Sequence, residues 1–383
     1  MSYDVEAVRR DEFAWAEAGE AIYLNNASTG PLPRRTVETL AEWGRLRANP
    51  ERITHERQFG ELTKARELIA ERIGADASEI ALATNTSFGL NLAAFALPFQ
   101  AGDVIVGPNG EFPANVYPWW QAARQRGLEH RMVECEGGVL TAERLARILD
   151  DDRVRAVAVS WVQFASGARV DLRALGALCR ERGVYFVVDA IQGLGPLTLD
   201  LRETHVDILS CGAQKWLLSP WGSGFAYVRR ELVGVLEPHD VSWMGVRGAD
   251  DFSRLVDYEL AWRSDARRFE FVTLPFQDVA AMNVSLELLR EIGARDAAAH
   301  ACGLADMIVE WALARSDIEL VTPAAADQRA AIVSLRPRDA ARVSARLAAA
   351  RVAHSVREGA IRLSPHWYNT ADEIQRALDA FTG

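Results

Sequence analysis

A lysine lies between two apolar segments of the chain. Lys215 follows the run VDILSCG (206–212) and precedes Trp216, two leucines and a Pro/Gly turn. An amine that loses its hydration has a lowered pKa, which makes it a competent nucleophile for imine formation. For a lysine taken alone, a buried ion pair is the simpler interpretation. The residues that accompany Lys215 in the fold decide between these two interpretations.

A carboxylate ends a second apolar run. Asp189 follows VYFVV (184–188), and Gln192 stands three residues further on. A carboxylate at the end of a buried strand loses hydration and needs a partner. It either caps the next helix or faces a cationic ligand.

Two hydroxyl residues stand where a helix is expected to begin. Thr86 and Ser87 belong to ATNTS (83–87), which opens the helical pattern SFGLNLAAFAL (87–97). Their hydroxyls and backbone N–H groups would suit an anion at a helix N-terminus. Taken alone, a plain N-cap explains them better.

The elements that must position these residues alternate between short apolar runs and helical patterns. Such alternation predicts a mainly parallel sheet with helices on both faces. The seven candidate strands are 79–85, 103–108, 130–135, 154–162, 184–190, 206–212 and 224–230. The connection into the last strand is too short for a helical crossover, so that strand should run antiparallel to its neighbours.

The pattern changes after about residue 265. A long helix is predicted over 278–316 with a break near Gly293, followed by short strands and helices typical of a smaller α+β domain. We therefore expect an N-terminal segment (1–22), a large ligand-binding domain (23–265) and a small C-terminal domain (266–383). In such proteins the ligand cleft lies at the carboxyl ends of the parallel strands.

The three polar features together match the needs of one cofactor, pyridoxal 5'-phosphate (PLP). Its phosphate needs a helix N-terminus, its pyridine nitrogen a carboxylate, and its aldehyde an amine. Thr86 with Ser87, then Asp189, then Lys215 supply these groups in chain order.

The segment VVDAIQGLG…VDILSCGAQKWLLSPWGSGFAYV resembles the class V aminotransferase family, which are fold type I PLP-dependent enzymes. The resemblance runs from YLNNASTGPLP (23–33) to RLSPHWYNTADEI (362–374). It implies that Lys215 forms the aldimine with the cofactor and later moves the Cα proton. It also implies that Asp189 pairs with the pyridine nitrogen, that Gln192 bonds the ring oxygen, and that Thr86, Ser87 and Gln214 hold the phosphate.

Four further roles follow from the same resemblance. Phe112, in EFPANVYPW (111–119), matches the residue that stacks on the cofactor ring. Thr273 matches a residue that reaches the phosphate of a neighbouring subunit, which implies a homodimer with sites at the interface. Arg362 matches the arginine that binds the substrate α-carboxylate, although a surface arginine on a strand end is the alternative. Asn26 matches a loop beside the substrate, with a turn residue as an equal alternative.

The chain departs from the cysteine desulfurases of this family. The region before Arg362, ARVAHSVREGAIR (350–362), contains no cysteine, and Gln214 stands where those enzymes have histidine. Transamination, or C–S or C–C cleavage of an α-amino acid, is therefore the predicted activity. The alternatives are an epimerase, a desulfurase that lacks the usual loop cysteine, and a non-catalytic binding protein.

Composition narrows the class of partner. A formal net charge of −10 argues against nucleic acid or an anionic membrane surface. Cys135, Cys179, Cys211 and Cys302 are far apart, and the seven histidines show no metal-ligand spacing. The N-terminus has no apolar signal region. We expect a cytoplasmic enzyme with a small amino-acid substrate and no bound metal.

Overall fold

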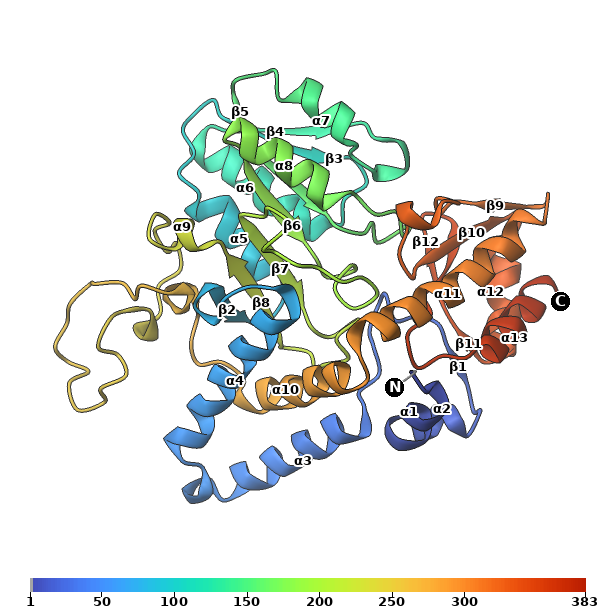
Figure 1. Ribbon diagram of the computed structural model, residues 1–383, viewed down its shortest axis with the longest axis horizontal. Helices are drawn as coiled ribbons and strands as arrows, with labels where there is room; N and C mark the ends of the chain where they lie inside the picture. The colour runs from blue at the N-terminus through green and yellow to red at the C-terminus, as the bar shows by residue number, and fades with distance from the viewer. Residues whose placement is uncertain (1–2) are drawn as a thin grey trace.

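The computed structural model describes residues 3–383. Within them, a central seven-stranded sheet has the order β2-β8-β7-β6-β5-β3-β4 (Figure 1). Each of the seven predicted strands is present: β2 (Ile80–Ala83), β3 (Val104–Pro108), β4 (Glu129–Val133), β5 (Val154–Ser160), β6 (Tyr185–Asp189), β7 (Ile208–Gly212) and β8 (Gly224–Val228). Strand β8 is antiparallel to both its neighbours, and the other pairs are parallel. The predicted direction of the last strand is confirmed.

Apolar side chains cover both faces of this sheet. Each face packs against its own hydrophobic core. In β3, Val104 and Val106 belong to the core on one face and Ile105 to the core on the other, as the two-residue period of a strand requires. Strands buried on both faces read as continuous apolar runs, which is why the sequence revealed them. The helices of this region are α4 (His55–Ile73), α5 (Thr86–Ala96), α6 (Tyr117–Arg126), α7 (Ala142–Ile148), α8 (Leu172–Arg182) and α9 (Arg230–Val233).

A second, antiparallel sheet with the strand order β12-β13-β10-β9 forms the C-terminal unit. Helix α10 (Phe276–Glu291) leads from the large sheet toward it, and Gly293, with φ of 83°, separates α10 from α11 (Ala294–Leu313). The predicted helix break is confirmed. The other elements are β9 (Ile318–Leu320), β10 (Val333–Pro337), α12 (Ala340–Ala349), β11 (Val352–Ala353), β12 (Ser355–Arg357), β13 (Ala360–Leu363) and α13 (Ala371–Thr382).

The N-terminal residues pack on the C-terminal unit. Strand β1 (Ile22–Tyr23) pairs in parallel with β11, and the Arg9 guanidinium donates to the carbonyl of Tyr368 at 2.8 Å. The helices here are α1 (Val5–Glu12) and α2 (Ala14–Glu17). Helix α3 (Arg34–Ala48) instead lies along α10, where the hydroxyls of Thr36 and Ser285 are hydrogen-bonded at 2.8 Å (Figure 1). The domain boundaries 22/23 and 265/266 stay predictions.

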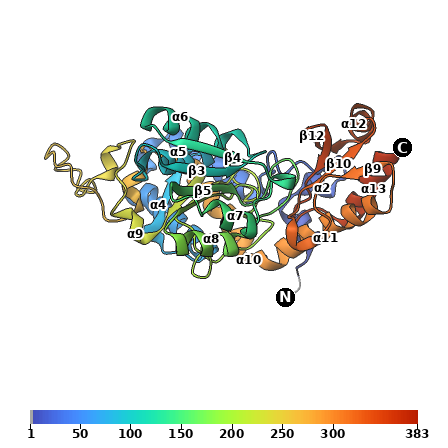
Figure 2. The ribbon, with the colours of Figure 1, turned by 90° about the horizontal axis from the view of Figure 1, so that it is seen from above.

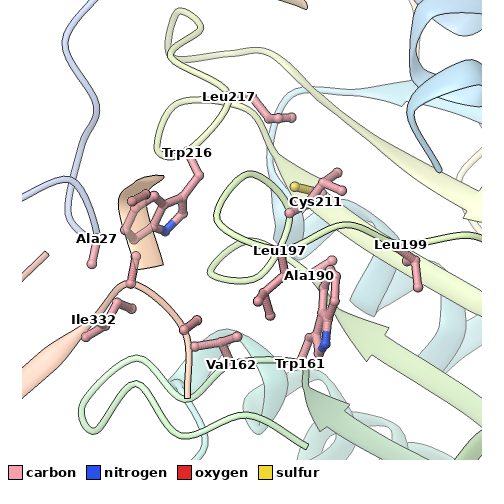
Figure 3. Packing of buried hydrophobic residues seen from close by; sticks show 14 of the residues in the cluster. Ala27, Trp161, Val162, Ala190, Leu197, Leu199, Cys211, Trp216, Leu217 and Ile332 are labelled. Atoms are coloured by element: carbon pink, nitrogen blue, oxygen red, sulfur yellow. The ribbon is translucent and has the colours of Figure 1, made fainter. Parts of the chain in front are cut away.

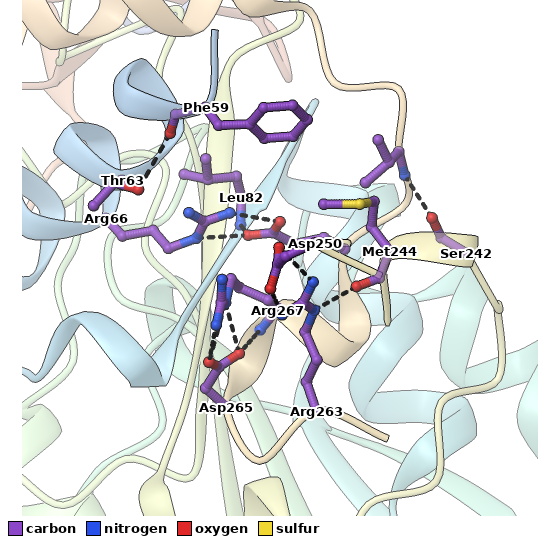
Figure 4. Close-up of polar contacts among 12 residues, drawn as sticks. Phe59, Thr63, Arg66, Leu82, Ser242, Met244, Asp250, Arg263, Asp265 and Arg267 are labelled. Carbon is purple, nitrogen blue, oxygen red and sulfur yellow. Dashed lines mark hydrogen bonds and ion pairs between the residues drawn. The ribbon is translucent and has the colours of Figure 1, made fainter. Parts of the chain in front are cut away.

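A long arm, residues 237–265, projects from the large sheet at the end of the molecule opposite the C-terminal unit (Figures 1 and 2). Within the arm, the Arg263 guanidinium pairs with the Asp250 carboxylate at 2.7 and 2.8 Å, and just beyond it Arg66 of α4 pairs with Glu270 at 2.7 Å (Figure 4). Sequence patterns did not predict this arm.

Candidate active site

Lys215 lies in the turn that follows β7. Trp216 and the two leucines after it are buried, and they hold the turn in the core (Figure 3). The lysine itself is half-buried, and its Nζ lies 5.7 Å from the centroid of the Phe112 ring. Burial lowers the pKa of Lys215 to about 8; Asp189 opposes this shift and the charge of Arg362 adds to it. The structure therefore presents a readily deprotonated amine beside the Phe112 ring.

The N-terminal loop around Gly30 lies directly against this turn. The N–H of Gly30 donates to the carbonyl of Gln214 at 2.9 Å. A Cβ at Gly30 would stand 2.1 Å from the carbonyl oxygen of Lys215, so only glycine fits there.

Asp189 ends β6 and is 2% exposed. Among residues 3–383, the one hydrogen-bond partner of its carboxylate is the N–H of Ile191, at 3.0 Å, and burial raises its pKa to about 6. No helix begins after it, because residues 191–193 form a turn. The helix-cap interpretation is therefore wrong, and the carboxylate is left for a cationic ligand.

Helix α5 brings its N-terminus beside this turn. Its cap is Asn85, whose side chain accepts from the N–H of Phe88, so Thr86 and Ser87 are not the cap. Thr86 Oγ1 accepts from the N–H of Gly212 at 2.9 Å, and its carbonyl accepts from the Ser210 hydroxyl at 2.7 Å. The first turn carries no acidic residue, so the helix N-terminus suits an anion.

Of the two predicted glutamines, Gln214 belongs to the Lys215 turn and Gln192 contacts that turn from the segment after β6. The amide of Gln192 donates to the carbonyl of Ala27 at 2.9 Å and accepts from Trp216 Nε1 at 2.8 Å, which leaves one N–H for a ligand. Gln214 is half-buried, and its Oε1 would stand 2.5 Å from a Cβ at Gly212.

Phe112 stands over the mouth of the site. It is 44% exposed, and its ring meets Phe164 edge-on at 5.2 Å. Its flat face near Lys215 suits stacking on an aromatic ring.

Arg362 is buried, with 2% exposure, so the surface-arginine alternative is wrong. Its guanidinium donates to the Ser28 hydroxyl at 2.8 Å, the Phe164 carbonyl at 2.6 Å and the Ser355 hydroxyl at 3.1 Å. All three acceptors are neutral, and no carboxylate pairs with it within residues 3–383. Burial, together with the charge of Arg357, lowers its pKa to about 10. A buried cation in neutral surroundings is stabilised by a bound anion.

Asn26 and Thr273 do not join this group. Asn26 is fully buried, and its amide donates to the Ser364 carbonyl at 2.8 Å and accepts from the Tyr368 hydroxyl at 3.0 Å. These bonds hold the N-terminal loop to the C-terminal unit. Thr273 is exposed on the segment before α10. The substrate role of Asn26 and the intersubunit role of Thr273 stay predictions.

One buried residue was missed by the sequence analysis. The carboxylate of Glu111 accepts from the Ser160 N–H at 2.7 Å, the Ser160 hydroxyl, Gln163 Nε2 at 3.0 Å and Asn115 Nδ2 at 3.2 Å. Burial raises its pKa to about 7, and the charge of Asp189 adds to the shift. Its place immediately before Phe112, in EFPAN, was the available signal.

Two large cavities lie elsewhere. They have volumes of about 1440 and 660 Å³, and neither is lined by Lys215, Asp189 or Arg362. Among residues 3–383 there is no cluster of His, Cys, Asp and Glu that could hold a metal ion. In the same range, every helix is too short or too polar to cross a membrane.

The residues of the site fit PLP. An unpaired buried carboxylate, a helix N-terminus without acidic neighbours and a half-buried amine converge at the carboxyl ends of β6 and β7. This arrangement within a mainly parallel sheet is that of a fold type I PLP-dependent enzyme.

Comparisons with known proteins agree. The family described as Aminotransferase class-V matches residues 22–377. A probable cysteine desulfurase of Methanothermobacter thermautotrophicus is 29% identical over 92% of each chain. Isopenicillin N epimerase of Streptomyces clavuligerus is 29% identical over 94% of this chain and 95% of its own. Among solved structures, a mutant of C-DES with glycine covalently linked to its PLP cofactor superposes with a TM-score of 0.87, at 21% identity over 97% of this chain and 98% of that chain. The chain therefore belongs to the class V aminotransferase family and is a PLP-dependent enzyme.

Proposed function

We propose that Lys215 binds PLP covalently and that the enzyme acts at the Cα of an α-amino acid. One observation carries this proposal. The chain has only two lysines, Lys64 and Lys215. Lys64 pairs with Glu287 at 2.9 Å on the surface, whereas Lys215 is half-buried near Asp189 and Arg362.

Each residue around the cofactor has a role that its surroundings support. When bound, PLP supplies an aldehyde that condenses with amines and a protonated ring that withdraws electrons from Cα. Asp189 holds the proton on the pyridine nitrogen, because a buried carboxylate favours an adjacent cation. Thr86, Ser87 and Gln214 bind the phosphate, Gln192 the ring oxygen, and Phe112 the ring face.

Arg362 binds the substrate α-carboxylate through its planar guanidinium. Asn26, through its bonds to Ser364 and Tyr368, supports the loop that carries Ser28, one of the acceptors of Arg362. Lys215 Nζ removes the Cα proton and returns it, since a pKa of about 8 allows both states near neutral pH.

Transamination, or C–S or C–C cleavage, is the reaction that these residues support best. A persulfide-forming desulfurase needs a reactive thiolate in the cleft. The four cysteines are free, and burial raises the pKa of Cys179 to about 12 and that of Cys302 to about 11. None lies between β11 and Arg362. Epimerisation is the second candidate, since it needs the same Cα chemistry and one relative carries that activity by name.

We also propose a cytoplasmic homodimer. The arm exposes large apolar side chains, with Val256 at 73%, Tyr258 at 91% and Leu260 at 76%. Such an exposed apolar surface is typical of an interface. A second copy would cover it and bring Thr273 toward the neighbouring phosphate site. The four free cysteines fit a reducing compartment.

Borohydride reduction followed by peptide mapping tests the proposal. We expect the cofactor on the Lys215 peptide, its loss in Lys215→Ala, and no change in Lys64→Ala. Cofactor on Lys64, or a colourless protein that PLP cannot reconstitute, would contradict it.

Amino acids are then screened for keto acid, sulfide and Cα–H exchange in deuterated water, which separates the reaction types. Size-exclusion chromatography with light scattering tests the dimer.

A further inference from the structure

A hairpin in the C-terminal unit carries a second arginine toward the site. Strands β12 and β13 are joined by Glu358 and Gly359, with φ of 47° and 76°. Two successive residues with positive φ define the tight turn that matches the twist of a hairpin. Arg357 ends β12 and lies opposite Ala360 across this turn.

The strand register places Arg357 on the same face of the sheet as Arg362. Ser355 lies opposite Arg362, and Arg357 lies two residues beyond Ser355. Side chains two apart on a strand share a face, as do directly opposed cross-strand residues. The hydrogen bond from Arg362 Nε to the Ser355 hydroxyl, at 3.1 Å, agrees with this register.

Arg357 has no anionic partner in the described part of the chain. The one acceptor of its guanidinium is the neighbouring Val356 carbonyl, at 2.9 Å. It is partly exposed, and its charge lowers the pKa of both Lys215 and Arg362. Both groups therefore lie within electrostatic reach of this guanidinium.

The same face offers an internal comparison. Arg336 lies on β10, two residues from Ser334, which is the partner of Arg362 on that strand. Its guanidinium pairs with Glu319 at 2.5 Å. Arg336 and Arg357 thus lie on one face of the sheet. The charge of Arg336 is balanced by Glu319, whereas that of Arg357, on the hairpin, has no carboxylate beside it among the described residues.

We propose that Arg357 binds a side-chain carboxylate of the substrate, so that the enzyme selects dicarboxylic amino acids. This inference rests on the proposed function, in which Arg362 takes the α-carboxylate. With Asp189 committed to the pyridine nitrogen, the cleft has two guanidinium groups for substrate anions. A planar guanidinium gives bidentate recognition of a carboxylate. A neutral analogue lacks the charge and the second carboxylate oxygen that this contact uses, so the guanidinium favours the dicarboxylate.

Binding of unreactive acids to the holoenzyme tests the inference without any reaction. Titration calorimetry compares succinate and glutarate with butyrate and valerate, the matched monocarboxylates. We expect the wild-type protein to prefer the dicarboxylates by about tenfold or more. Arg357→Gln should abolish this preference and leave monocarboxylate affinity within about twofold. Arg336→Gln, the matched control, should keep it. Arg357→Lys should keep part of it, because the charge remains and the bidentate geometry is lost.

Three outcomes would overturn the inference: equal affinity for both classes of acid, a preference that survives Arg357→Gln, or loss of PLP from that variant, which would assign the arginine to the cofactor. Steady-state kinetics give the second readout. The ratio of kcat/KM for aspartate to kcat/KM for asparagine should fall in Arg357→Gln, and so should the same ratio for glutamate and glutamine. A protein that binds dicarboxylates as expected but converts no amino acid would contradict the proposed function and leave the anion site standing.

Discussion

The Arg362 guanidinium donates to the Ser28 hydroxyl at 2.8 Å, although 334 residues separate the two in the chain. Ser28 in turn donates to Asn25 Oδ1 at 2.8 Å. A loop from the N-terminus and a strand from the C-terminal sheet thus meet at one buried cation. The end of the site that we propose to bind the substrate carboxylate forms only when both chain ends have packed together.

Replacing Arg362 with glutamine should raise KM for amino acids by about 10- to 100-fold, because a charge-assisted, bidentate contact is lost. PLP content should not change, since the cofactor contacts lie elsewhere. Arg376→Gln, at an exposed position on α13, serves as the control. An unchanged KM would remove Arg362 from substrate binding.

The apoprotein should capture PLP faster as pH rises, with a midpoint near the lowered pKa of Lys215, about 8. The neutral amine is the nucleophile, and its fraction grows above that pH. Because the folded state binds fewer protons than the unfolded chain between about 8 and 10.4, Lys215 also makes apoprotein stability rise with pH there. Stopped-flow absorbance at a series of pH values measures the midpoint. A midpoint close to that of free lysine would contradict the observed burial.

Asp189→Asn should make the apoprotein more stable and the holoenzyme less active. The buried carboxylate has lost hydration without gaining an ion pair, so its neutral replacement should add about 1–2 kcal/mol to the free energy of unfolding at pH 7. Cα–H exchange should slow on the order of 100-fold, because nothing then holds the proton on the ring nitrogen. Urea unfolding and exchange in deuterated water measure the two effects. Unaltered exchange would show that Asp189 does not serve the cofactor.

Glu111→Gln should destabilise the protein by about 1–3 kcal/mol, since an amide would turn its own N–H groups toward donors that now bond a carboxylate. The matched control is Glu134→Gln, which replaces an exposed acceptor of Asn109 and should change stability by less than about 0.5 kcal/mol. Chemical denaturation of the two variants measures both changes in the free energy of unfolding. Equal effects would mean that the buried network contributes nothing special.

Arg72→Met should stabilise the protein by about 1 kcal/mol, because Arg72 is a largely buried guanidinium without a carboxylate partner in the described residues. Its Nε has no hydrogen-bond partner, and its one acceptor is the Leu197 carbonyl at 3.5 Å. The control is Arg202→Met. Arg202 lines the same 660 Å³ cavity but is exposed and pairs with Asp200, so its replacement should leave the free energy of unfolding unchanged or lower it slightly. If Arg72→Met proves the less stable of the two, the buried charge has a partner in solution.

The sequence by itself determined much of this protein. The strands are continuous apolar runs because both faces of the sheet are buried, so their positions and the direction of β8 could be predicted. Lys215 and Asp189 could be paired for the same reason, since parallel strands end at one edge of a sheet. Gly293 marked the break between the two long helices.

Only the tertiary structure decided what each polar group faces. The sequence alone allowed Arg362 to lie on the surface. Its burial depends on three neutral acceptors that come from distant parts of the chain. Glu111 is central because four donors converge on it, and Arg357 is significant because it lacks the carboxylate that Arg336 has. Periodicity reports local burial, whereas hydrogen bonds and ion pairs between remote segments form only when the whole chain has packed.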